Sequence, residues 1–211
     1  CVWRGCTYTA WHALHRCARL QPGERVLVHS AAGAVGLMAL QVARDAGARV
    51  VGLCGGGAKV DWVRSFGFDA VLDYLDAAWP EAARAAVDGG AYDVILDGNG
   101  GANAAHNYTL VAPLGRIVHL GAMAGAPHPP VPMALLVDRS FSVGGMTLRQ
   151  VEVAPGSEAD LAMIEAVRSG RWRLPIGDQV PLDEVVSLHR RLEARLLRGR
   201  AVIEVGGEDP R

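Results

Sequence analysis

The chain has 211 residues, half of them hydrophobic and a fifth charged, which is enough for one medium-sized globular domain with its own core. Its 21 basic and 22 acidic residues give a formal net charge of −1, so no electrostatic case exists for binding to nucleic acid or to a membrane surface. The longest apolar runs have the length of strands, so we expect no transmembrane helix. The four cysteines form no regular framework, which indicates reduced thiols and a cytoplasmic protein.

Apolar segments of β type alternate with helical patterns, which predicts an α/β fold with a parallel sheet covered on both faces. The predicted strands are 26–29, 48–54, 70–72, 94–97, 116–120 and 141–145. The predicted helices between and before them are 9–20, 35–45, 58–66, 76–87 and 102–111. Prolines exclude regular structure at 127–132. The remaining chain predicts helices at 157–169 and 182–197 and a last strand at 201–205.

A dinucleotide-type fingerprint joins the first predicted strand to the next helix, with the spacing Ala31-x-Gly33-x-x-Gly36. Small residues let the backbone turn tightly beside a pyrophosphate, and the unpaired N–H groups of the new helix, which starts at Ala34 and Val35, point at that anion. Gly36 lets the helix pack closely on the strand. The alternative is a glycine-rich turn in an unrelated α/β protein.

The loop after the second predicted strand favours NADPH over NADH. An NAD site would carry an acid here, about twenty residues past the fingerprint, to hold the ribose 2′-hydroxyl. This chain instead has Gly55-Gly-Gly-Ala-Lys59, which offers a 2′-phosphate room, backbone donors and a positive charge. Lys59 is the only lysine among the 21 basic residues. The alternative is that Lys59 is a solvated residue at the start of the next helix.

Several segments resemble the medium-chain dehydrogenase/reductase superfamily, and within it the zinc-independent quinone oxidoreductases. The segments that carry the resemblance are 6–14, 20–29, 31–36 and 92–97, followed in order by 114–121, 175–176, 181–184 and 189–193. The resemblance implies a Rossmann-type, doubly wound dinucleotide-binding domain in residues 1–149. It also implies that residues 150–211 are the C-terminal segment of a GroES-like substrate domain. The N-terminal part of that domain is missing, and the chain opens with a cysteine and no signal peptide pattern, so we expect it to begin within a longer gene product.

The resemblance also implies which residues contact NADP(H). Thr9, Asn99, Gly121 and Ala122 would surround the nicotinamide and its ribose; Gly33, Ala34, Val35 and Gly36 would lie along the pyrophosphate; Gly55, Lys59 and Tyr74 would hold the 2′-phosphate and adenosine. At the position of Asn99 the family more often has an apolar residue. Tyr74 could equally be a half-buried tyrosine at the end of a strand.

The implied activity is the transfer of hydride from NADPH to a quinone or to an α,β-unsaturated carbonyl, in a homodimer paired along the strand 141–145. No residue is predicted to donate the proton. One alternative is a cofactor-binding fragment or interaction module without turnover. Another is an enoyl reductase domain of a polyketide synthase, although such domains commonly have a lysine where this chain has Ala122.

No metal site is predicted. Zinc-dependent members of the superfamily have a cysteine ligand four residues before the threonine equivalent to Thr9, and this chain has Gly5 there, with Cys6 one position away. His12 and His15 are three residues apart on a predicted helix, but no cysteine or carboxylate joins them at ligand spacing. We expect both to be ordinary surface or core histidines.

Overall fold

The computed structural model describes residues 4–123, 125–151 and 155–205, and a six-stranded sheet lies at its centre. The strands follow the order β3-β2-β1-β4-β5-β6, and every pairing is parallel. They are β1 (Arg25–His29), β2 (Arg49–Cys54), β3 (Val71–Asp73), β4 (Tyr92–Asp97), β5 (Val111–His119) and β6 (Ser142–Gly145). The chain therefore winds outward from β1 in one direction and from β4 in the other, which confirms the predicted doubly wound Rossmann-type sheet.

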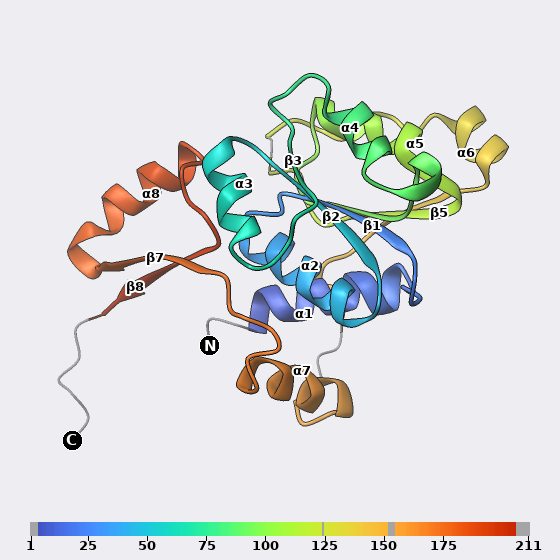
Figure 1. Cartoon of the computed structure of the whole chain (residues 1–211). Helices are drawn as coiled ribbons and strands as arrows, with labels where there is room; N and C mark the ends of the chain where they lie inside the picture. Colours follow the sequence, from blue (N-terminus) through green and yellow to red (C-terminus); the bar gives the residue numbers. More distant parts are fainter. Residues whose placement is uncertain (1–3, 124, 152–154, 206–211) are drawn as a thin grey trace.

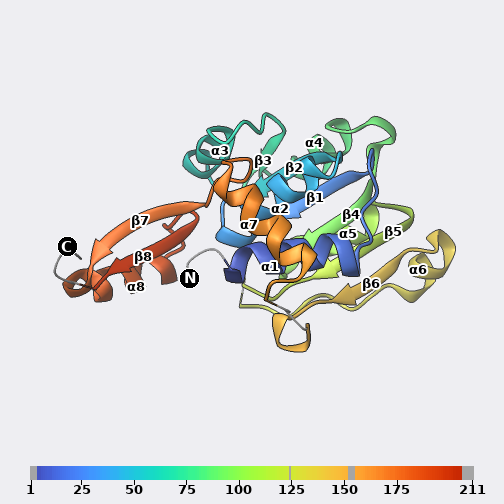
Figure 2. The ribbon, with the colours of Figure 1, turned by 90° about the horizontal axis from the view of Figure 1, so that it is seen from below.

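Helices cover both faces of this sheet (Figures 1 and 2). One hydrophobic core contains residues of α1 (Arg4–His12), α2 (Ala34–Asp45), α3 (Gly57–Arg64) and α7 (Glu158–Arg168). The other contains residues of α4 (Trp79–Ala85), α5 (Asn107–Leu110) and α6 (Met133–Arg139). Within β1, Val26 and Val28 face the first core and Leu27 the second, because successive side chains of a strand point to opposite faces.

A smaller unit follows the main sheet. It contains β7 (Ile176–Pro181), a short 3₁₀ turn η5 (Leu182–Glu184), α8 (Val185–Glu193) and β8 (Arg200–Glu204), with β7 and β8 paired in parallel. Figure 1 shows this unit beside α3. A buried amide side chain attaches the chain leading into it, because Gln41 of α2 donates to the Arg173 carbonyl and accepts from the Arg173 N–H.

The structure differs from the predicted elements in several places. The first helix begins earlier than predicted, at Arg4, and continues as a π-helical turn η1 (Ala13–Cys17), in which Ala18 N–H reaches back five residues to Ala13. The predicted helix 102–111 is a 3₁₀ turn η3 (Ala102–His106) and the short α5, because β5 already begins at Val111. A predicted helix over 182–197 ends at Glu193. Strand β7 and helix α6 are absent from the prediction.

The remaining short elements are the 3₁₀ turns η2 (Asp88–Gly90) and η4 (Leu148–Gln150). In the described part of the chain, we find no helix with both the length and the apolar character that a membrane crossing requires.

The tight turn from β1 into α2 generates a prediction about stability. A Cβ added to Gly36 would lie 2.2 Å from the Ser30 carbonyl oxygen and 2.9 Å from Ala31 Cα. Overpacking of this kind costs about 1–3 kcal/mol. We expect Gly36→Ala to lower the free energy of unfolding by that amount in urea denaturation. Gly57→Ala is the control, because a Cβ there meets no atom within 4 Å; equal stability of the two variants would contradict the prediction.

Candidate functional site

A cleft of about 490 Å³ opens at the carboxyl ends of β1, β2 and β4, where the strand order reverses. Open α/β sheets bind ligands at this position. All the predicted site residues except Gly121 and Ala122 line the cleft. Nine of the 22 residues that line this cavity were therefore singled out from the sequence, in segments that lie far apart along the chain.

The fingerprint turn forms the floor of the cleft. Ser30 has a left-handed backbone (φ 52°), and its carbonyl accepts from the Gly33 N–H at 2.8 Å. Gly33 is the N-cap of α2, and no side chain caps this helix end. The first N–H groups of α2, among them those of Ala34 and Val35, have no carbonyl partner within the helix. A floor of this kind can bind an anion.

The glycine loop after β2 is held in place by Asp73, at the end of β3. Asp73 Oδ1 accepts from the Gly56 N–H at 2.8 Å and from the Leu75 N–H at 2.9 Å. The absence of a side chain at Gly55 makes room for the Tyr74 ring, since a Cβ there would lie 2.5 Å from Tyr74 Cζ. The sequence allowed Tyr74 to be either a cofactor contact or a half-buried tyrosine at the end of a strand. In the structure it is half-buried and it also lines the cleft.

Lys59 lies at the same end of the cleft, where its Nζ donates to the Arg195 carbonyl at 2.6 Å. Burial lowers the pKa of the Lys59 ammonium from its ordinary value, and the nearby Arg195 charge adds to this effect, although Cys54 opposes it. The attraction of an anion bound beside Lys59 would offset both unfavourable contributions. None of the described residues that line the cleft is an aspartate or glutamate.

One wall of the cleft comes from residues that the sequence analysis did not assign to it: Leu192, Arg195, Leu197 and Gly199. The Arg195 guanidinium donates to the Met123 carbonyl across the cleft, and the Gly199 N–H donates to the Ala32 carbonyl at 2.7 Å. Nothing in the local sequence signals this wall, because it depends on how the C-terminal unit packs against the fingerprint turn.

At the opposite end of the cleft, Thr9 and the buried Asn99 contribute to the lining. Thr9 Oγ1 donates to the Gly5 carbonyl at 2.7 Å, so toward a ligand this hydroxyl can only accept. Gly121 and Ala122 are exposed and do not line the cleft, whereas their neighbours Leu120 and Met123 do. The predicted pair thus belongs to a loop that borders the cleft, but other residues of that loop line it.

A buried polar network lies below this end of the cleft. His29 Nε2 donates to Asn107 Oδ1 at 2.7 Å, and Asn107 Nδ2 donates to Asp97 Oδ2 at 2.8 Å. Burial lowers the pKa of His29 from its ordinary value, although the nearby Asp97 opposes this effect. Burial opposes ionisation of Asp97, but the nearby His29 and the backbone N–H groups of Asn99 and Gly100 outweigh it and hold the pKa of Asp97 below its ordinary value.

Residues 34–163, more than half of the chain, match the family described as zinc-binding dehydrogenase. The chain belongs to this family. It lies within the medium-chain dehydrogenase/reductase superfamily, as the sequence predicts, and its match spans α2 through most of α7.

Individual proteins of known sequence or structure resemble this family member over nearly its whole length. The chain is 29% identical over 200 residues to a phenolphthiocerol/phthiocerol polyketide synthase of Mycobacterium tuberculosis, covering 93% of this chain and 9% of that protein. A crystal structure of an NAD-dependent alcohol dehydrogenase superposes with a TM-score of 0.83 at 28% identity, covering 96% of this chain and 57% of that one. A mycobacterial protein solved in complex with NADPH also superposes with a TM-score of 0.83 at 28% identity, covering 94% of this chain and 62% of that one. The zinc-binding dehydrogenase chain thus spans less than two thirds of each of these proteins.

The ligand position that zinc-dependent relatives would use does not fit a metal here. Gly5, in α1, has no ligand atom on its side chain, and Cys6 is buried in the core beside it. His12 packs between the rings of Tyr8 and Trp11. Across residues 4–123, 125–151 and 155–205, only Asp97, His119 and His128 form a group with the composition and spacing of a metal site, and the sequence analysis had not connected them.

Proposed function

We propose that this chain forms the cofactor-binding part of an NADPH-dependent reductase of the quinone oxidoreductase type. Hydride would pass to a quinone or to the β-carbon of an α,β-unsaturated carbonyl. The observation that carries the proposal is the charge of the cleft. Its adenosine end has the Lys59 ammonium and a loop of glycines, and the Arg195 guanidinium extends across the cleft. Among the described residues, no carboxylate lines the cleft to bind a free ribose 2′-hydroxyl.

Each part of the cleft then has a role in binding. The amides at the start of α2 bind the pyrophosphate, the Gly55 loop and Lys59 bind the 2′-phosphate, and Tyr74 packs beside the adenosine. Thr9 Oγ1 accepts from the nicotinamide end. When bound, the nicotinamide supplies the hydride, and the protein orients it and excludes water. No residue of the described cleft is assigned to protonating the acceptor.

The 2′-phosphate assignment is tested at Lys59. We expect Lys59→Ala to weaken NADPH binding by about 1–3 kcal/mol, the range of hydrogen bonds to charged groups, and to leave NADH binding nearly unchanged. Isothermal titration calorimetry with both cofactors measures the difference. Arg171→Ala is a matched control, because Arg171 is outside the cleft and pairs with Asp45. Equal weakening of both cofactors would mean that Lys59 acts through its bond to the Arg195 carbonyl and not through a phosphate.

A second candidate is an enoyl reductase domain of a polyketide synthase. The similarity to a polyketide synthase over 93% of the chain favours it. A third is a cofactor-binding module without turnover. All three share the cleft; the first two differ in the acceptor that they reduce, and the third reduces none.

Turnover distinguishes these candidates. We expect this chain with NADPH to lose cofactor absorbance when 9,10-phenanthrenequinone is added, because quinone reduction needs mainly close placement of the acceptor over the nicotinamide. Crotonyl-N-acetylcysteamine, a thioester of the kind an acyl carrier presents, is the competing acceptor. Oxidation with the thioester alone would favour the enoyl reductase. NADPH binding with neither acceptor reduced would favour the module.

We further propose that two copies pair along β6, which is an edge of the sheet. Beside it, α6 exposes Met133 and Val137, apolar surface that a second copy could cover. The Met146 N–H donates to the His119 carbonyl of β5, so the alternation of a strand directs the Gly145 N–H away from β5 and toward a partner.

Sedimentation equilibrium tests this pairing. The wild-type chain should be a dimer, and Gly145→Pro, which removes the outward donor, should raise the dimer dissociation constant by about tenfold or more, since main-chain bonds supply much of the affinity of strand addition. The control is the midpoint of thermal unfolding at low protein concentration, where a dimer has dissociated, because it shows whether the variant monomer still folds. A wild-type monomer at all concentrations would reject the proposal.

A further inference from the structure

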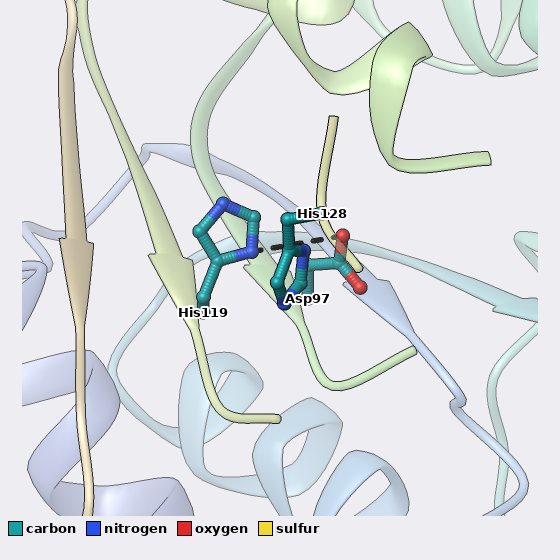
Figure 3. A group of neighbouring side chains, drawn as sticks. All are labelled: Asp97, His119 and His128. Carbon is teal, nitrogen blue, oxygen red and sulfur yellow. Dashed lines mark ion pairs between the residues drawn. The ribbon is translucent and has the colours of Figure 1, made fainter. Parts of the chain in front are cut away.

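Two histidines and an aspartate meet near the carboxyl ends of β4 and β5 (Figure 3). Asp97 ends β4, His119 ends β5, and the two are partners in the parallel pairing of these strands. His128 comes from the proline-containing segment that follows, and its ring centroid lies 4.0 Å from that of His119. One ligand atom from each of the three residues lies within 4.8 Å of the other two. None of the three lines the cofactor cleft.

His128 has a lone pair without a partner. Its Nε2 lies 2.9 Å from the Gly121 carbonyl oxygen, which can only accept, so Nε2 carries the proton. Nδ1 is then the unprotonated nitrogen, and it is buried without a hydrogen-bond partner. Histidines that bind metals commonly have this arrangement, with one nitrogen donating to a backbone carbonyl and the other facing the ion.

His119 has the same feature. Its Nδ1 is buried without a hydrogen-bond partner and lies 3.8 Å from Asp97 Oδ2, beyond hydrogen-bond distance. Burial lowers the pKa of His119 and the neighbouring His128 lowers it further, although Asp97 opposes them. The Nδ1 atom thus belongs to the group without making a hydrogen bond, and in its unprotonated form it can bind a metal ion.

Asp97 is already oriented by its own contacts. Oδ1 accepts from the backbone N–H groups of Asn99 and Gly100, and Oδ2 accepts from Asn107 Nδ2. These bonds keep the carboxylate charged and leave one lone-pair position of Oδ2, which faces His119. The Asn107 bond gives the carboxylate the supporting hydrogen bond that metal-ligating carboxylates generally have.

We propose that Asp97, His119 and His128 bind a divalent transition-metal ion of the Zn²⁺ type. Two imidazoles and one carboxylate suit Zn²⁺, whereas Mg²⁺ and Ca²⁺ prefer oxygen ligands alone. Three protein ligands leave a fourth position for solvent in a tetrahedral site. Zinc–nitrogen bonds of about 2.0–2.1 Å require the three ligand atoms to move toward one another by roughly an ångström. His128 can make this movement because Pro127 and Pro130, on either side of it, are exposed. The ion would link β4, β5 and the segment of His128.

Zinc titration by calorimetry tests the site. The parent protein for this experiment is the untagged chain, freed of metal by a chelator. It carries Cys17→Ser, because the exposed Cys17 thiol could itself bind zinc. We expect one equivalent of Zn²⁺ to bind and to raise the midpoint of thermal unfolding. His128→Gln and His119→Gln should each weaken binding by about tenfold or more. His189→Gln, on the exposed side of α8, is the matched control and should bind as the parent does.

The visible absorption of bound Co²⁺ gives a second readout that needs no activity. The parent should show the intense bands of four-coordinate Co²⁺, and His128→Gln, which changes an exposed segment and leaves the strands intact, should lose them. Zinc affinity that is unchanged in both histidine variants, or that is only millimolar in the parent, would overturn the proposal. Because both metal measurements are made without cofactor, this outcome does not depend on whether the chain binds NADPH.

Discussion

The close approach of α2 to the end of β1 is the constraint on which the rest of the molecule depends. Gly36 packs directly against the Ser30 carbonyl, with no room for even one methyl group. This contact fixes the direction in which α2 leaves the sheet and therefore where its first N–H groups point. The glycine loop after β2 and the Asn99 turn after β4 flank this point, because β2 and β4 are the two neighbours of β1. One packing requirement thus determines the position of the cleft.

Much of the fold could be predicted from sequence because its signals are local. Apolar β-type runs bounded by small residues marked the strands of the main sheet, and glycines marked the turns that close the cleft. The errors occurred where tertiary contacts decide the structure. β7 contains Gly177, Asp178 and Pro181 and becomes a strand by pairing with β8. Val111 was predicted to end a helix and residues 112–115 were assigned to no element, but 111–115 extend β5, where Tyr92 pairs with Val111.

The same distinction applies to the site. Residues such as Gly33, Gly55 and Lys59 were identified because a fingerprint or a departure from background composition marks them in sequence. Arg195 and Gly199 were missed, since their part in the cleft depends on bonds to Met123 and Ala32 in distant segments. The Asp97, His119 and His128 group was missed for a related reason. Strand register places the first two side by side, and a segment without regular structure adds the third.

The bond between Gly199 and Ala32 also affects how the molecule assembles. It joins residues that are far apart in sequence, and the parallel bridge between Gly33 and Gly199 lies at the same point. Closing so long a loop costs considerable chain entropy, so contacts of this kind form late, after local helices and neighbouring strands. On a ribosome, the central sheet can begin to form before the segment around Gly199 has left the exit tunnel. This wall of the cleft must wait until that segment emerges, so the nascent chain acquires its architecture before it acquires a finished cavity.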